Sequence, residues 1–234
     1  MGLAAGFPKL DRPAPSPGRC ASFKMDSYQI TFQTWNKVAV LYQDKFMNLD
    51  LYNDTYDGFC ELVEISNPAI LEIGCGPGNI TKYLLAKRPD FQIDAIDVAP
   101  NMIELAKANN PTVCFSVRDC RNICTIPSKY DAIIAGFCLP YLSKEDTAKF
   151  LKDCAGLLNK GGILYFSTIK GDYANSGFVA GSTRDKCYVY YYKENDLRHE
   201  LAQSNFDVLE VKHKTFSKED GTTSEDMVFI VKKT

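Results

Sequence analysis

The sequence contains no apolar run long enough to cross a bilayer and no excess of basic charge. Its longest apolar candidate, Ala132 to Leu142, is about half of the roughly 20 residues required and contains Gly136 and Pro140. With 27 basic and 29 acidic residues the net charge is −2, so no overall positive field favours nucleic acid or an anionic membrane surface. We therefore expect a soluble protein with no membrane span, for which nucleic acid is an unlikely partner.

Cysteine spacings typical of metal sites or disulfide frameworks are also absent. The nine cysteines are odd in number and scattered, and none forms a CxxC pair. The tightest group, Cys114, Cys120 and Cys124, has no histidine nearby, and Pro127 stands where an iron–sulfur spacing would need a further cysteine. We therefore expect no bound metal, reduced thiols and a cytoplasmic location.

Length and composition indicate one domain with an extension. The 234 residues exceed the roughly 150 of an average domain, and the hydrophobic (45%) and charged (24%) fractions are ordinary for a globular chain. Residues 1–24 hold four of the eleven prolines and carry four basic residues against one acid. This predicts a disordered tail, a vector-derived segment or sequence upstream of an alternative start at Met25. Residues 25–234 are then expected to form the single folded domain.

Secondary-structure signals divide that domain into four segments. Residues 25–66 favour N-terminal lid helices in two pieces, and residues 67–170 alternate strand with helix, which implies a parallel sheet covered on both faces. Residues 171–192 form an acceptor-side insertion, in which 171–177 and 181–185 are expected to be flexible and polar and 188–192 is rich in tyrosine. Residues 193–234 form a helix and an antiparallel hairpin. The predicted strands are 69–73, 91–96, 112–117, 130–136, 162–169, 206–216 and 226–232. The predicted helices after the lid are 79–87, 100–109, 144–158 and 194–204.

A glycine-rich turn follows the first predicted strand. Gly74, Gly76 and Gly78 lack a Cβ, so the chain can turn tightly and present backbone amides to a ligand at the start of the next helix. The alternative is a loop that is tight for packing alone. The dinucleotide pattern GxGxxG would need glycine where this chain has Asn79, and Glu72 is also unlike that pattern, so a nicotinamide-dependent reductase is disfavoured.

A carboxylate ends the second predicted strand of the same region. Asp97 follows Gly78 by 19 residues, and an acid at this position can accept hydrogen bonds from both hydroxyls of a ribose. The alternative is an ordinary solvated acid at the end of a strand. Because a glycine turn of nucleotide-binding type lies beside it, the nucleotide interpretation is favoured.

These motifs together resemble the class I S-adenosylmethionine-dependent methyltransferases. The resemblance covers about residues 67–170 well and extends more loosely to the C-terminal hairpin. It implies an α/β fold with a doubly wound, mostly parallel seven-stranded sheet, an antiparallel C-terminal hairpin, helices on both faces and an N-terminal helical lid. It also implies S-adenosylmethionine as the cofactor. The matching segments are residues 72–78, Asp97, 117–120, 130–136 and 157–164.

Carried onto this sequence, the resemblance implies a role for each motif residue. The glycine loop would face the methionine part and the ribose of the cofactor, and Asp97 would bind the ribose hydroxyls. Val98 and Met102 would flank the adenine, whose edge would be read by Asp119 and by the amide of Cys120.

Aromatic side chains would complete the cofactor site. Phe137 would line its floor beside the sulfonium, and Tyr42 or Trp35 from the N-terminal helices would cover it, since an aromatic face attracts a sulfonium through cation–π interaction. Plain core packing is the alternative for both of these lid residues. The implied cofactor-binding residues are Glu72, Gly74, Cys75, Gly76, Gly78, Asp97, Val98, Met102, Asp119, Cys120, Phe137, Tyr42 and Trp35.

The acceptor side has fewer sequence signals. Pro140 and Tyr141 lack the preceding Asn-Pro or Asp-Pro of amino-group methylases, which disfavours a DNA or glutamine acceptor. Tyr141 is the candidate catalytic residue, as an acceptor-orienting group or a weak base, with plain packing as the alternative. The insertion at 171–192 supplies the other acceptor-side surface.

We therefore expect methyl transfer to an oxygen, nitrogen or carbon atom of a small-molecule acceptor by in-line displacement. The alternatives are a protein or RNA methyltransferase and a catalytically inactive cofactor-binding subunit. The sequence makes no prediction of oligomeric state.

Overall fold

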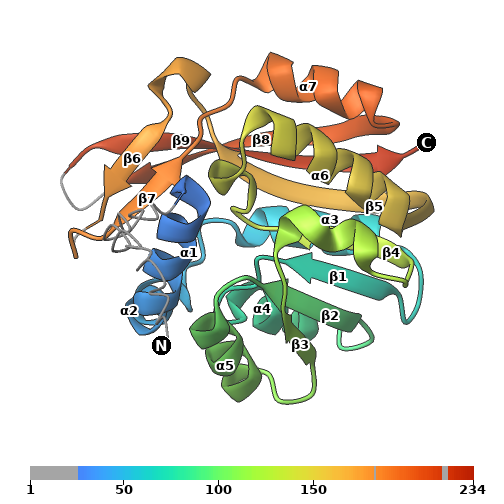
Figure 1. The fold of residues 1–234 in the computed structure, drawn as a ribbon. Helices are drawn as coiled ribbons and strands as arrows, with labels where there is room; N and C mark the ends of the chain where they lie inside the picture. Colours follow the sequence, from blue (N-terminus) through green and yellow to red (C-terminus); the bar gives the residue numbers. More distant parts are fainter. Residues whose placement is uncertain (1–25, 182, 218–220) are drawn as a thin grey trace, which may run out of the picture.

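The computed structural model describes residues 26–181, 183–217 and 221–234. Its main sheet contains the strands β1 (Ala69–Ile73), β2 (Gln92–Asp97), β3 (Cys114–Val117), β4 (Tyr130–Ala135), β5 (Leu158–Ile169), β8 (Phe206–Ser217) and β9 (Thr223–Lys233). They lie in the order β3-β2-β1-β4-β5-β9-β8 (Figure 1). The strands β1 to β5 are parallel, whereas β9 pairs antiparallel with both β5 and β8. The predicted fold class is therefore confirmed. Residues 1–24 of the expected tail, and 218–220 of the hairpin turn, lie outside the described residues.

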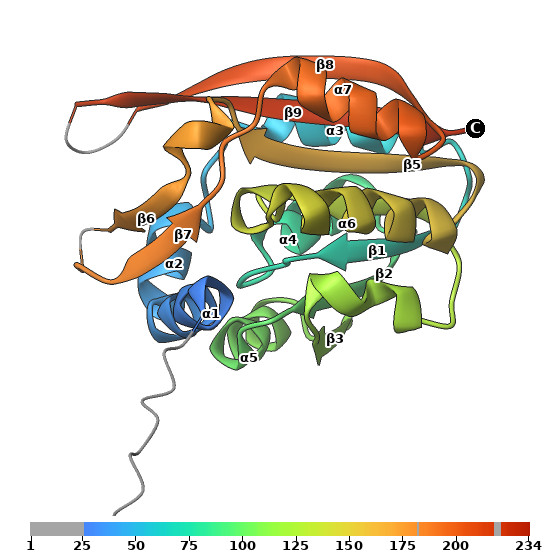
Figure 2. The same ribbon diagram turned by 45° about the horizontal axis from the view of Figure 1, so that its top comes forward.

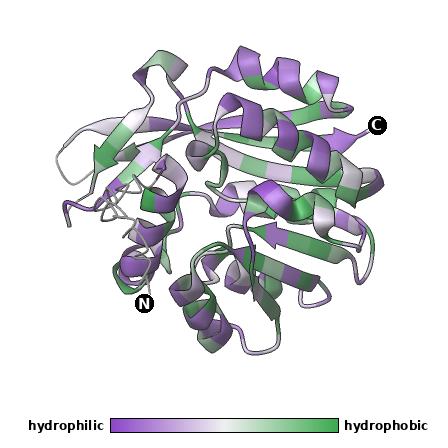
Figure 3. Ribbon diagram, in the orientation of Figure 1, coloured by the Kyte–Doolittle hydropathy of each residue, from purple (hydrophilic) through white to green (hydrophobic). Residues whose placement is uncertain are grey.

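Four helices cover the faces of this sheet: α4 (Asn79–Lys87), α5 (Pro100–Asn109), α6 (Lys144–Leu157) and α7 (Glu194–Gln203). Figure 2 shows α6 and α7 in front of the sheet. Strand β1 is buried on both sides, with Leu71 in the apolar cluster under α6 and α7 and Ile70 in the cluster that contains residues of α4 and α5. A strand covered on both faces is apolar throughout, and Figure 3 shows β1 as largely hydrophobic between helices with hydrophilic outer faces.

Local capping signals place the helix boundaries. The Ser143 hydroxyl accepts a hydrogen bond from the Asp146 amide at 3.2 Å, which caps the start of α6. Pro100 occupies the first turn of α5, where its missing N–H costs nothing. The predicted helices 79–87 and 100–109 coincide with α4 and α5. Among the described residues, no helix is long and apolar enough to span a membrane.

The N-terminal region forms three helices, although the sequence predicted two. They are α1 (Ser27–Lys37), α2 (Ala39–Phe46) and α3 (Asn53–Leu62). A single non-helical residue, Val38, separates α1 from α2. The apolar pattern of the sequence continues through this residue, which is why one helix was predicted for both. Tyr56 and Phe59 of α3 are buried in the cluster that contains Ile70. This third helix is therefore part of the packed core beneath the sheet, and α1 and α2 provide the covering part of the region.

The insertion at 171–192 contains a second sheet that the sequence did not predict. Strands β6 (Gly177–Ala180) and β7 (Lys186–Val189) pair antiparallel, and Phe178 and Tyr188 face each other across the pair with ring centroids 5.1 Å apart. The hairpin packs on α1 through a hydrogen bond from the Tyr188 amide to the Thr31 hydroxyl at 2.9 Å. The cross-strand aromatic pair and this docking stabilise the two strands of the insertion, which the sequence did not predict.

The stacked pair of Phe166 and Phe229 joins β5 to the reversed strand β9 and should be essential for stability. Their rings lie 4.9 Å apart and nearly parallel, and both side chains are fully buried. We expect Phe229→Ala to lower the free energy of unfolding by about 3–5 kcal/mol because it leaves a cavity in the core. Chemical denaturation measures this loss. Phe178→Ala, at a side chain that is 48% exposed, is the matched control and should cost about 1 kcal/mol or less; equal losses would contradict this assignment of the core.

Candidate functional site

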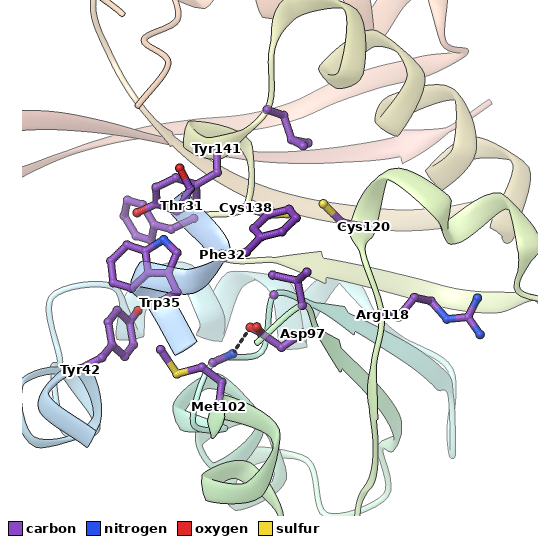
Figure 4. A pocket seen from close by; sticks show the side chains of 16 residues that line it. Thr31, Phe32, Trp35, Tyr42, Asp97, Met102, Arg118, Cys120, Cys138 and Tyr141 are labelled. Atoms are coloured by element: carbon purple, nitrogen blue, oxygen red, sulfur yellow. Dashed lines mark hydrogen bonds between the residues drawn. The ribbon is translucent and has the colours of Figure 1, made fainter. Parts of the chain in front are cut away.

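A pocket opens at the carboxyl ends of β1, β2 and β4, beneath α1 and α2 (Figure 4). Because β2 and β4 lie on opposite sides of β1, this is the topological switch point of the sheet, where ligands of open α/β folds bind. The empty space is about 770 Å³, which includes the open solvent at the mouth. Its lining residues are Thr31, Phe32, Trp35, Tyr42, Gly74, Gly76, Asp97, Val98, Met102, Arg118, Cys120, Gly136, Phe137, Cys138, Tyr141 and Leu142.

The glycine loop enters the pocket through Gly74 and Gly76. Their φ angles are +70° and +52°, a left-handed conformation that explains the need for glycine. A Cβ at Gly76 would lie 3.6 Å from Cε1 of Tyr42, so the aromatic lid comes close to the loop backbone. Gly78 lies behind the pocket, at the start of α4, where a Cβ would come within 2.4 Å of the Asn110 side chain.

Asp97 is tied to this loop at the end of β2. One carboxylate oxygen accepts from the Gly76 amide at 2.9 Å and the other from the Ala99 amide at 2.8 Å. A carboxylate has about four lone-pair sites, so two remain for further donors. Burial raises the pKa of Asp97, and the backbone donors partly offset that shift. The side chain therefore faces the pocket and is not an ordinary solvated acid.

Glu72 and Cys75 support the loop from behind the pocket. Oε2 of Glu72 accepts from the Thr81 hydroxyl at 2.5 Å, which holds α4 against β1, while Oε1 is buried without a partner among the described residues. Burial raises the pKa of Glu72 to about 8. Cys75 is buried in the apolar cluster with Ile70. The resemblance implied cofactor contact for both residues, but the structure places neither in the pocket lining.

Asp119 also lies outside the pocket lining, although Val98, Met102 and Cys120 line it. The Asp119 carboxylate binds the Arg121 guanidinium, with Nη2 to Oδ2 at 2.6 Å, and accepts from the Arg121 amide at 2.9 Å. These contacts cap the short helix η1 (Cys120–Thr125). The implied role of Asp119 at the adenine edge is therefore not supported by its side-chain geometry, because its oxygens are already engaged by Arg121.

An aromatic wall closes the opposite side of the pocket. Trp35 makes edge-to-face contacts with Tyr42, at 5.5 Å between ring centroids, and with Tyr141, at 5.4 Å. Phe137 follows β4 with a φ of +55°, donates its amide to the Ser167 hydroxyl at 2.8 Å and packs edge-on against Tyr52. The sequence-derived aromatic residues therefore come together from α1, α2 and the segment after β4.

Tyr141 remains protonated at neutral pH. Burial raises its pKa well above the ordinary value of a tyrosine, with nearby acids and thiols adding to the shift. A phenol in this state can donate a hydrogen bond to a bound molecule but cannot take up a proton. Of the roles expected for Tyr141, this geometry favours orientation of an acceptor over action as a base.

Several pocket residues were missed by the sequence analysis. Phe32 precedes Trp35 by one helical turn and shares its face of α1, a spacing that the apolar pattern already contained. Cys138 lies directly after Phe137, and a Cβ at Gly74 would be 3.7 Å from its Cβ. Nothing in the local sequence distinguishes Arg118 and Cys138 from ordinary loop residues.

Residues 70–162 match a family model described as a methyltransferase domain. These residues are therefore similar to a methyltransferase domain, and the fold is similar to that of a solved methyltransferase. A protein of Invertebrate iridescent virus 6 whose name describes it as a methyltransferase is 31% identical over 136 residues, which cover 58% of this chain and 48% of that protein. A malonyl-acyl-carrier-protein O-methyltransferase of Acetivibrio thermocellus is 37% identical over 108 residues, covering 42% and 35%. The matched regions thus span about a third to a half of the length of these relatives.

Solved structures share the fold of this chain over most of its length. The 1,6-didemethyltoxoflavin N1-methyltransferase of Burkholderia thailandensis has a TM-score of 0.66 and 17% identity, covering 96% of this chain and 93% of that one. The magnesium protoporphyrin IX methyltransferase of Synechocystis, solved with bound S-adenosylmethionine, scores 0.65 at 15% identity, covering 92% and 100%. The cyclase SpnF scores 0.65 at 16% identity, covering 88% and 96%, so the fold alone does not specify the reaction.

The buried Glu72 makes the stability of the protein pH-dependent. An unfolded glutamic acid loses its proton near pH 4.5, whereas the folded state holds the proton until about pH 8. Between these values the unfolded state binds fewer protons, so the free energy of unfolding should fall as pH rises, by at most about 1.4 kcal/mol per pH unit. Glu72→Gln should remove this contribution, as urea denaturation at several pH values would show. The exposed Glu64→Gln should retain it; an unchanged slope in Glu72→Gln would contradict the assignment.

Proposed function

We propose that this chain binds S-adenosylmethionine in the pocket described above and transfers the methyl group to an oxygen, nitrogen or carbon atom of a small-molecule acceptor. The observation that carries the proposal is the meeting of Asp97, the Gly74–Gly76 backbone and the aromatic wall around Trp35 in one pocket. The methyltransferase domain match over residues 70–162 supports the same chemistry.

The residues present fit this cofactor. The two unused lone-pair sites of Asp97 can accept the ribose hydroxyls, while Gly74 and Gly76 allow the methionine part to approach the backbone. Val98 and Met102 offer apolar surfaces for the adenine. The aromatic faces of Tyr42 and Trp35 can attract a cation through their ring quadrupoles.

The transfer itself needs mainly positioning. When bound, S-adenosylmethionine supplies an activated methyl group on a sulfonium. The chain's own residues hold the acceptor in line with that group and exclude water, because the pocket wall formed by Phe32, Trp35, Phe137 and Tyr141 is aromatic. Tyr141 orients the acceptor by donating its hydroxyl proton in a hydrogen bond.

A small-molecule acceptor agrees with the charge and with the relatives. The net charge is −2, so no overall positive field favours a nucleic acid substrate. Relatives by sequence include a trans-aconitate 2-methyltransferase of Methylobacterium radiotolerans, and the structural neighbour from Burkholderia thailandensis was solved with bound 1,6-didemethyltoxoflavin. The eight described cysteines are all free, which favours a reducing compartment such as the cytoplasm.

We further propose that each segment of the chain has a separate role. Residues 67–170 bind the cofactor, α1 and α2 of the N-terminal segment 25–66 cover it, and the insertion at 171–192 borders the acceptor. The docking of β7 on α1 through Thr31, which itself lines the pocket, supports this arrangement. The C-terminal segment, residues 193–234, completes the sheet.

Asp97→Ala tests the cofactor site. Near 100 times the dissociation constant, S-adenosylhomocysteine should stabilise the wild type by about 2.7 kcal/mol, or roughly 5–11 °C in thermal midpoint for a chain of this size. The Asp97→Ala variant loses the charge-assisted hydrogen bonds to the ribose, so its affinity for S-adenosylhomocysteine should be at least about tenfold lower. Isothermal titration calorimetry would measure this loss. Asp94→Ala, on the exposed outer part of the same strand, is the control and should bind normally. Undiminished affinity in Asp97→Ala, or stabilisation by NADH alone, would contradict the proposal.

The acceptor class is tested by following a methyl label. Purified protein and S-adenosylmethionine with an isotopically labelled methyl group should be incubated with a cell extract divided by dialysis into small molecules and macromolecules. We expect S-adenosylhomocysteine to form, and the label to accumulate, with the small-molecule fraction. Label confined to protein or RNA would overturn the small-molecule assignment. Cofactor binding without turnover in either fraction would support the inactive-subunit alternative.

A further inference from the structure

Two thiols meet inside the candidate cofactor pocket. Cys120 starts the helix η1, just beyond β3, and Cys138 follows the end of β4, so they belong to strands separated by β2 and β1 in the sheet. Both side chains line the pocket, and Figure 4 draws them on the same wall. Neither thiol has a role in the proposed methyl transfer.

These two thiols share one pocket lining and one apolar cluster. A side-chain hydrogen bond with Cys120 is the largest cause of the raised pKa of the Cys138 thiol. Cys138 is 8% exposed and packs in the apolar cluster under α6, with Cys120 at the edge of that cluster. Cys120 is only half-buried, so a small solute in the pocket can reach it first.

We propose that Cys120 and Cys138 form an oxidation site in the cofactor pocket, which peroxide converts to a disulfide that prevents cofactor binding. The sulfur of Cys120 attacks the peroxide O–O bond and becomes a sulfenic acid, while hydrogen peroxide is reduced to water. The Cys138 sulfur then attacks the sulfenic sulfur, the S–S bond forms and a second water leaves. Two thiols are thereby oxidised by two electrons and one peroxide is reduced.

Burial assigns the two roles. A side-chain hydrogen bond with Cys120 and burial raise the pKa of Cys138 well above that of a free thiol, so Cys138 is the poorer first target and is left to resolve the sulfenic acid. Burial also raises the pKa of Cys75 and of Cys154 well above the ordinary value, which makes both poor first targets. Cys154 on α6 is a competing partner for Cys120, since Cys120 acts electrostatically on the titration of Cys154.

The effect on binding rests on the proposed function. Cys120 lies with Val98 and Met102 on the side of the pocket that would hold the adenine. A covalent bond to Cys138 would pull the start of η1 toward the end of β4 and move the Cys120 amide. Bound cofactor would in turn cover both thiols, so binding and oxidation should exclude each other.

The experiment uses the full chain, reduced and then exposed to hydrogen peroxide with or without S-adenosylhomocysteine. After alkylation of free thiols, peptide mass spectrometry should detect a Cys120–Cys138 disulfide, and S-adenosylhomocysteine should suppress it. Calorimetry should show at least about tenfold weaker binding of S-adenosylhomocysteine by the oxidised protein, with recovery after a thiol reductant. Cys120→Ser and Cys138→Ser should each abolish the disulfide and keep binding insensitive to peroxide. Cys114→Ser, at an exposed thiol on β3, should behave as the wild type.

Three results would overturn the proposal: no disulfide under peroxide, a Cys120–Cys154 disulfide in its place, or a Cys120–Cys138 disulfide that leaves binding unchanged. If S-adenosylhomocysteine fails to bind even the reduced protein, the proposed function fails. The peptide mapping still decides separately whether the two thiols form the disulfide, because it needs no ligand.

Discussion

The hydrogen bond from the Gly76 amide to the Asp97 carboxylate joins the carboxyl ends of two neighbouring parallel strands. It requires the left-handed conformation of the glycine, because only then does the loop after β1 turn back across the end of β2. The amides of Gly74 and Cys75 both donate to the Ile96 carbonyl and hold the same turn from the other side. The shape of the pocket follows from these contacts, since Asp97 can face a ligand only while the loop remains in this position.

The covering wall depends on contacts made far from the pocket. The Tyr28 hydroxyl at the start of α1 donates to Asp146 and accepts from the Ser143 amide, which anchors the helix to the start of α6. The Arg121 guanidinium lies 4.0 Å from the centre of the Tyr28 ring while it binds Asp119. Helix α1 is therefore positioned by Arg121, the same residue whose guanidinium binds the Asp119 carboxylate outside the pocket. The hairpin of β6 and β7 also packs on α1.

Local signals were sufficient for most of the fold. Strands β1 and β4 follow from short apolar runs, because burial on both faces selects apolar residues at successive positions. The boundaries of α4 and α5 follow from a glycine or proline at the start of each helix. The hairpin of β6 and β7 was missed because its order depends on docking against α1, more than a hundred residues earlier. The break at Val38 was missed because the apolar pattern continues through it.

The sequence by itself determined the fold class, the position of the nucleotide-type loop and the acid at the end of β2, because these depend on residue type at short spacing. Only the tertiary structure decided which motif residues face the pocket. Glu72 turns to Thr81, Gly78 meets Asn110 and Asp119 turns to Arg121, so these residues, like the buried Cys75, support the site from outside its lining. The direction of a side chain depends on its partner and on the turn of the backbone, and the motif spacing specifies neither.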